Sequence, residues 1–172
     1  MLLHLTTFDL SILKSYKEDI LLNKHLTNKS YSNMYEILFD SKNFTTTLST
    51  VLEKIQEKTG NTFDVYVKNM WGYVQDTTKQ ESIDFKKTFK DQLTILPDYS
   101  FIYLINSIET YVHLSTEGKL NKHVVTLNEG DLLIFKTEDF INEESTSQSR
   151  VALVGSIALV RDNIKPVKKA LI

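Results

Sequence analysis

The spacing of hydrophobic positions changes once along the chain, near Gly60, from a helical period to a strand period. Over residues 9–22 and 43–59, apolar side chains recur three or four residues apart. This spacing predicts two amphipathic helices, with Asp9 as the N-cap of the first and Gly60 directly after the end of the second. Their apolar positions are Leu10, Leu13, Tyr16, Ile20 and Leu21, and then Phe44, Leu48, Val51, Leu52 and Ile55.

Beyond Gly60, β-branched and aromatic residues alternate with polar ones, which is typical of strands. Strands are predicted at residues 62–75, 99–105, 109–115, 122–127, 131–136 and 150–159, with an edge strand at 1–10 and a kink or bulge near Asn69. Residues 24–33 are predicted as a loop, and 76–91 as a long loop or a short irregular helix. Helices followed by closely spaced strands predict an α+β fold, built as a sandwich or jelly roll.

The composition is that of an ordinary globular protein, with 172 residues, 41% hydrophobic side chains and a net charge of -2. We expect one domain over residues 1–160 and a C-terminal extension over 161–172. The absence of Cys excludes disulfides, thiolate nucleophiles and Cys-ligated zinc. The chain has no signal-peptide pattern and no apolar run long enough to span a membrane, so we expect it in the cytoplasm.

Pieces of the chain resemble, in order, the phage-type branch of the 2-oxoglutarate/iron(II) oxygenases, which are similar to prolyl hydroxylases. The pieces are Ser32-Asn33, Asn69-Met-Trp-Gly-Tyr-Val, Ser100-Phe-Ile-Tyr-Leu, Gly130-Asp-Leu-Leu-Ile-Phe and Arg150-Val-Ala. The resemblance covers about residues 30–160. It implies a double-stranded β-helix, which is a jelly roll with helices packed against its outside, and this agrees with the predicted α+β order.

The resemblance also implies an iron(II) site of two His and one carboxylate, and this sequence departs from it. Residues 74–97 contain no His, and the position of the family's second His, about eleven residues after Gly130, is Ile141. The His residues of the chain are His4, His25, His113 and His123. Carboxylates from Asp76, Glu81 and Asp84 would favour magnesium or calcium over iron. We therefore predict no metal, no cofactor and no catalytic residue.

Arg150 stands where the resemblance implies a basic residue that binds 2-oxoglutarate, and Tyr103 is expected to point into the same barrel. The two residues are the candidate remnant of that pocket. Alternatively, Arg150 forms an ion pair with Asp131, Glu143 or Glu144, or caps its strand at the surface, and Tyr103 only packs in the core. The acidic run from Glu138 to Glu144 is predicted to be a mobile loop at the mouth of the barrel.

These observations predict a non-catalytic protein with an oxygenase fold. It would act as a structural or interaction module, for example in the neck, baseplate or tail of a tailed phage, or in its assembly. The alternatives are an active iron(II)/2-oxoglutarate dioxygenase with atypical ligands, and a metal-free protein that binds small anions. The expected partners are phage structural proteins or copies of the chain, without membrane. Nucleic acid is not expected, because Asp84 and Asp91 flank the basic patch of Lys86, Lys87 and Lys90.

Overall fold

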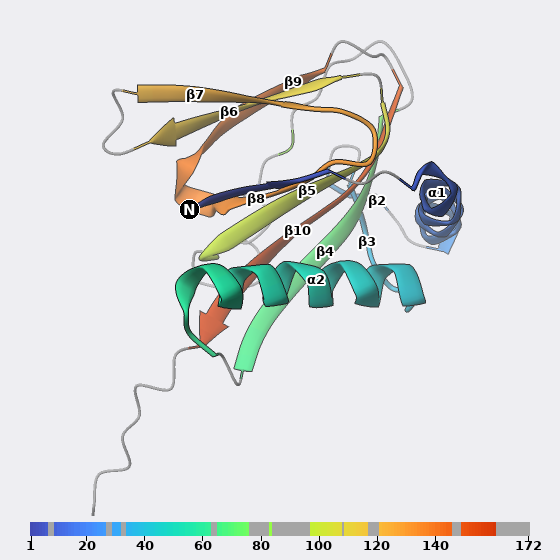
Figure 1. Cartoon of the computed structure of the whole chain (residues 1–172). Helices are drawn as coiled ribbons and strands as arrows, with labels where there is room; N and C mark the ends of the chain where they lie inside the picture. Colours follow the sequence, from blue (N-terminus) through green and yellow to red (C-terminus); the bar gives the residue numbers. More distant parts are fainter. Residues whose placement is uncertain are drawn as a thin grey trace, which may run out of the picture.

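Two antiparallel sheets face each other, and two helices cover the outer side of the larger sheet (Figure 1). The computed structural model describes residues 1–6, 9–26, 29–31, 34–62, 65–75, 83, 97–107, 109–116, 121–145 and 149–160. The predicted loop or helix at 76–91 and the predicted extension at 161–172 lie outside the described residues, apart from Ile83. The division into one domain and an extension therefore stays a prediction.

Both predicted helices are confirmed, α1 at Leu10–Leu26 and α2 at Lys42–Thr59. Asp9 accepts a hydrogen bond from the backbone N of Ser11 at 3.0 Å, at the start of α1. Gly60 ends α2 in the left-handed region, with φ of 68°, which glycine adopts without the strain of a Cβ. These local signals explain why the sequence fixes the position of both helices. The described residues contain no helix long and apolar enough to cross a membrane.

The larger sheet places strands that are distant in sequence side by side, in the order β1-β8-β5-β10-β4-β3-β2. These strands are β1 (Leu2–Leu5), β8 (Leu132–Lys136), β5 (Tyr99–Asn106), β10 (Arg150–Val160), β4 (Val65–Gln75), β3 (Met34–Glu36) and β2 (Lys29–Tyr31). The edge strand expected at the N-terminus is confirmed as β1. A bulge near Asn69, one of the two expected irregularities, is wrong, because β4 and β10 pair without a register shift over their whole length. The alternative, a kink there, stays a prediction.

The smaller sheet consists of β7 (Asn121–Leu127), β6 (Thr110–Thr116) and β9 (Phe140–Ser145), with β6 in the middle. Two expectations are corrected here. The acidic run contains strand β9 rather than a mobile loop. The stretch predicted as a loop at 24–33 contains the end of α1 and strand β2.

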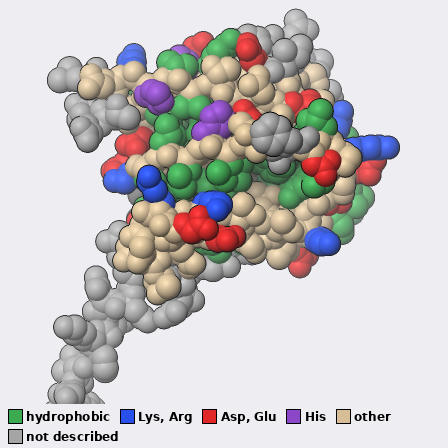
Figure 2. Space-filling model, viewed as in Figure 1, with side chains coloured by type: hydrophobic (Ala, Val, Ile, Leu, Met, Phe, Trp, Pro, Cys, Tyr) green, Lys and Arg blue, Asp and Glu red, His purple; other side chains and the backbone are tan. Residues whose placement is uncertain are grey.

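The apolar core forms two layers, one on each face of the larger sheet. Between this sheet and the helices lie residues such as Leu13, Tyr16, Ile20, Phe44, Val51, Phe101, Tyr103, Leu153 and Ile157. Between the two sheets lie residues such as Trp71, Tyr73, Leu104, Val112, Leu114, Phe135, Phe140 and Val154. The central strands are thus buried on both faces, so they have continuous apolar sequences. On the face seen in Figure 2, acidic and basic side chains are interspersed over the surface.

Candidate functional site

A β-bulge in β9 turns two side chains into the space between the sheets. Val112 of β6 pairs with Glu143, and Leu114 pairs with Phe140, with a register shift between His113 and Leu114. Ile141 is therefore the extra residue, and 42% of it is exposed. Because of this bulge, Phe140 and Glu143 are both buried although they are three positions apart. The bulge thus brings a carboxylate into the sandwich.

Arg150 meets this carboxylate from the first position of β10. Its two terminal nitrogens donate to Glu143, with Nη1 at 2.9 Å from Oε2 and Nη2 at 2.5 Å from Oε1. The side chains of Arg150 and Glu143 are only 2% and 1% exposed. The backbone N of Ile83 donates to the same Oε1 at 3.1 Å. The pair is therefore a buried, bidentate ion pair with an additional donor on the carboxylate.

Aromatic and amide groups complete the surroundings of the pair. The guanidinium carbon of Arg150 lies 4.5 Å from the centroid of the Tyr73 ring, within the range of a cation–π contact. The Tyr73 hydroxyl lies 3.2 Å from Oε1 of Gln75 and donates to it. Burial alone would lower the pKa of Arg150, but the carboxylate of Glu143 and the neighbouring Tyr73 outweigh it and raise that pKa above its ordinary value. Arg150 is thus held in its charged form.

The hydrogen-bond partners of Arg150 determine whether its guanidinium is available to a ligand. Of the three ion-pair partners predicted for it, the structure shows Glu143. Asp131 instead lies 2.9 Å from Nε2 of His4, and Glu144 lies 3.9 Å from Nε2 of His113. Since both terminal nitrogens of Arg150 are engaged by a carboxylate of its own chain, an incoming anion would have to displace Glu143. The sequence offered Glu143 as one of three possible partners but did not single it out, because it assigned the acidic run that contains Glu143 to a loop.

Tyr103 lies on the other face of the sheet. It packs edge-on against Tyr16 of α1, with ring centroids 5.1 Å apart, in the layer between sheet and helices. Arg150 instead shares the inner face with Tyr73. The expectation that Tyr103 points into the barrel beside Arg150 is therefore wrong. Whether either residue binds an anion stays a prediction.

The described residues do not fit the iron(II) site that the resemblance implies. Beside Ile141, the inward-facing side chain is Phe140, which stacks on Phe135 with centroids 5.7 Å apart. No three His, Asp or Glu side chains gather as a metal site in the part of the chain that the structure describes. The candidate carboxylates Asp76, Glu81 and Asp84 lie outside that part. An apolar ring thus lies next to the position where the resemblance implies an imidazole.

Comparison with solved structures identifies the fold. A prolyl-4-hydroxylase from Pseudomonas putida has a TM-score of 0.59 at 9% identity, over 93% of this chain and 93% of that chain. A viral collagen prolyl hydroxylase from Paramecium Bursaria Chlorella virus-1, solved as a 2OG complex, has a TM-score of 0.57 at 8% identity, over 93% and 96%. The sequence matches no protein-family model and no curated protein. The predicted α+β fold, a double-stranded β-helix like that of the prolyl hydroxylases, is thereby confirmed.

Proposed function

We propose that this chain is a non-catalytic protein with an oxygenase fold, and that it acts as a structural or interaction module. The observation that carries the proposal is the buried ion pair of Arg150 and Glu143. In this reading, Glu143 takes the position that a ligand carboxylate would need, and its bidentate geometry matches that of such a ligand. Phe140 adds support, because it fills the inner face beside Ile141 with an apolar ring.

The pair also argues against a metal-free protein that binds small anions. An anion reaching Arg150 would have to push Glu143 from its partners, and a buried carboxylate without a cation costs several kcal/mol. It would also break the hydrogen bond from the backbone N of Ile83. A dissolved dicarboxylate therefore competes poorly with Glu143.

The proposal is tested by titrating the metal-stripped protein with iron(II) and 2-oxoglutarate under nitrogen. Calorimetry and the visible charge-transfer band of the ternary complex are the two readouts. We expect neither heat nor band with the wild-type chain. The matched variant Glu143→Ala frees the guanidinium of Arg150, so 2-oxoglutarate should bind it weakly without iron. A saturable signal with the wild type, lost in Arg150→Ala, would overturn the proposal in favour of an enzyme.

The resemblance to phage-type sequences supports a more specific form of the proposal. In this form, the chain is made in the host cytoplasm and then joins the virion of a tailed phage or its assembly, with phage structural proteins or copies of itself as partners. The test is an immunoblot for the chain on virions purified by density gradient. A stoichiometric amount in the particles is expected. Its complete absence from virions and from assembly intermediates would contradict this form.

A further inference from the structure

One edge of β4 has no neighbour among the described strands over part of its length. Along β10, β4 pairs at every residue from Val65 to Gln75. On its other side, β3 pairs only with Trp71, Gly72 and Tyr73, and one more backbone bond joins Ile37 N to Met70 O at 3.2 Å. Residues 65–69 therefore have an open edge with respect to the described part of the chain, roughly 16 Å long at the usual rise per residue.

The hydrogen bond from Ile37 N to Met70 O shows to which side the backbone groups along this edge point. Met70 turns its carbonyl oxygen toward β3, away from β10. In a strand, alternate residues turn their N–H and C=O groups to the same side. Lys68 and Tyr66 therefore direct theirs to the open edge. A row of donors and acceptors that no described strand pairs with is the template on which an extended peptide adds as a further strand.

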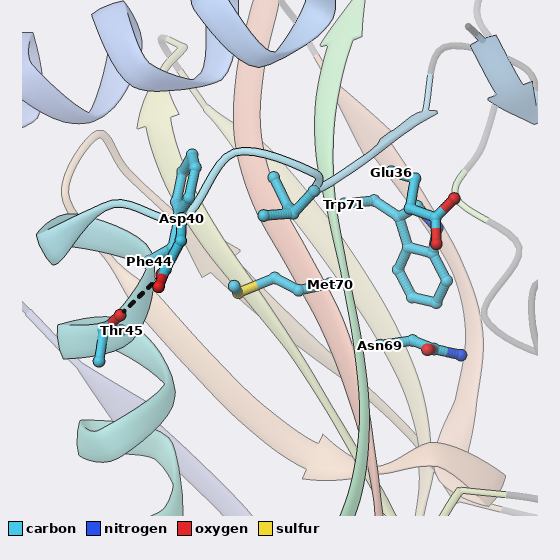
Figure 3. A pocket seen from close by; sticks show the side chains of 8 residues that line it. Glu36, Asp40, Phe44, Thr45, Asn69, Met70 and Trp71 are labelled. Carbon is cyan, nitrogen blue, oxygen red and sulfur yellow. Dashed lines mark hydrogen bonds between the residues drawn. The ribbon is translucent and has the colours of Figure 1, made fainter. Parts of the chain in front are cut away.

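A pocket of about 300 Å³ lies where this open edge meets β3. Glu36 and Trp71 are cross-strand partners, and Asn69 is two positions before Trp71, so the three side chains share one face of the sheet. Figure 3 shows Glu36, Trp71 and Asn69 on one side of β4 and Met70 on the other. Asp40 and Thr45, at the start of α2, line the pocket as well.

Two polar groups in the pocket have no partner in the part of the chain that the structure describes. The Nδ2 atom of Asn69 is buried and makes no hydrogen bond to any described residue, although a buried donor without an acceptor is costly. The exposed carboxylate of Glu36 has no cation beside it among the described residues. The other carboxylate, Asp40, accepts a hydrogen bond from Thr45 at 3.2 Å, and no cation of the described residues lies beside it. The pocket thus offers negative charge to a cation and a donor to a carbonyl oxygen.

We propose that the open edge at residues 65–69 and the adjoining pocket bind an extended segment of a partner protein by strand addition. A Lys or Arg side chain of that segment enters the pocket beside Glu36, and a backbone carbonyl of the segment accepts from Asn69. The proposal rests on the proposed function as an interaction module, and it defines the chemistry of the partner. Charge complementarity selects this occupant, because the exposed carboxylate of Glu36 favours a basic segment over an acidic or neutral one. Asp40 lies on the other side of β4, with Met70 (Figure 3), and adds negative charge to the rim of the pocket.

The test uses random heptapeptides displayed on phage and selected against the full-length chain. Recovered peptides are then synthesised, and their affinity is measured by fluorescence polarisation. We expect sequences rich in β-branched residues with one shared Lys or Arg position. Glu36→Gln should weaken binding about fivefold, the value of one partly exposed ion pair. The control Glu53→Gln removes an exposed carboxylate on α2 and should change nothing.

Lys68→Pro tests the strand edge itself. Proline removes the N–H that points away from β10, a position where edge strands tolerate it, so folding should persist while peptide binding is lost. Lys68→Thr keeps the N–H and is the matched control. Should Lys68→Pro not fold, hydrogen exchange of the Tyr66 and Lys68 amides in the wild type replaces it, with protection expected only when peptide is bound.

Several results would overturn the inference. These are the recovery of no peptide, recovered peptides without a basic position, and binding unchanged in both Glu36→Gln and Lys68→Pro. A dimer that light scattering detects and Lys68→Pro abolishes would make a second copy the occupant instead. None of these results touches the proposed function, because an interaction module is able to use another surface. Binding of iron(II) and 2-oxoglutarate would overturn the proposed function alone.

Discussion

Replacing Arg150 with Met tests whether the charge pair is as buried as the structure shows. The substitution removes the guanidinium and leaves Glu143 buried at 1% exposure, with the backbone N of Ile83 as its remaining donor. Breaking one side of a buried ion pair costs about 3–5 kcal/mol. Folded domains are stable by only about 5–15 kcal/mol, so this one change removes a large share of the total.

The assay is urea unfolding followed by circular dichroism. With an m-value of roughly 2 kcal/mol/M, the midpoint should fall by about 2 M in Arg150→Met. The double variant Arg150→Met with Glu143→Met should recover about half of this loss, because two apolar side chains replace the pair. It should remain about 1–3 kcal/mol below the wild type, since the backbone N of Ile83 then lacks its acceptor.

Two results would refute the reasoning. A loss below about 1 kcal/mol in Arg150→Met would be the size expected for a solvated ion pair. The space between the sheets would then be open to water and ligands, and the proposed function would lose its main support. Additive effects of the two single substitutions would likewise show that Arg150 and Glu143 do not interact.

Three further predictions concern other parts of the core. Gly155→Ala should lower the free energy of unfolding by about 1–3 kcal/mol, because the added Cβ would lie 2.5 Å from the Phe101 ring and 2.9 Å from the backbone O of Asn69. Gly60→Ala has open space around its Cβ, so it should cost only about 1 kcal/mol, which comes from the positive φ. The urea midpoints of the two variants measure this difference. Asn69→Ala removes a buried donor without a partner, so its melting temperature should equal or exceed that of the wild type. Burial raises the pKa of Tyr16, so the contribution of its neutral hydroxyl to stability is complete below about pH 10 and is lost as the pH rises through the raised pKa. Urea unfolding should therefore show a lower stability at about pH 11 than at about pH 9. Tyr16→Phe should reduce this difference.

The sequence predicts those elements whose signal is local. Both helices have an apolar stripe of helical period and a recognisable terminal residue, Asp9 or Gly60. The strands β5, β8 and β10 have continuous apolar sequences, because helices cover one face of their sheet and the second sheet covers the other. Both patterns, the apolar stripe of a helix and the continuous apolar run of a strand, are visible within a few consecutive residues.

The elements that the sequence does not predict depend on distant contacts. Strand β3 has only three residues, and the Asn23 side chain of α1 holds the chain around it by binding Glu36 O, Leu38 N and Phe39 N. In β9, the bulge at Ile141 removes the alternation that would reveal a strand. Neither the contacts of Asn23 nor the bulge at Ile141 is visible in a short stretch of sequence.

The sequence does not predict on which face of β5 Tyr103 lies, for a different reason. Every residue from Tyr99 to Ile105 is buried, so the hydrophobic pattern does not distinguish the helix side of β5 from the inner side. The register with β10 decides it, since Tyr103 pairs with Leu153, which packs under the helices. A candidate site built from residues on two different strands therefore requires the register of both, which periodicity does not supply.

The charge pair has a further consequence for how the two sheets fit together. Glu143 belongs to the smaller sheet and Arg150 to the larger one, and the bulge at Ile141 is what aims Glu143 inward. A slip of β9 by one residue would turn Glu143 away and leave Arg150 buried without a counter-charge, at a cost of several kcal/mol. An apolar pair would tolerate such a slip far better, because dispersion contacts are not directional. We therefore expect the double Met variant to stay folded but to show broadened amide resonances along β9, whereas sharp resonances identical to the wild type would show that apolar packing alone sets the register.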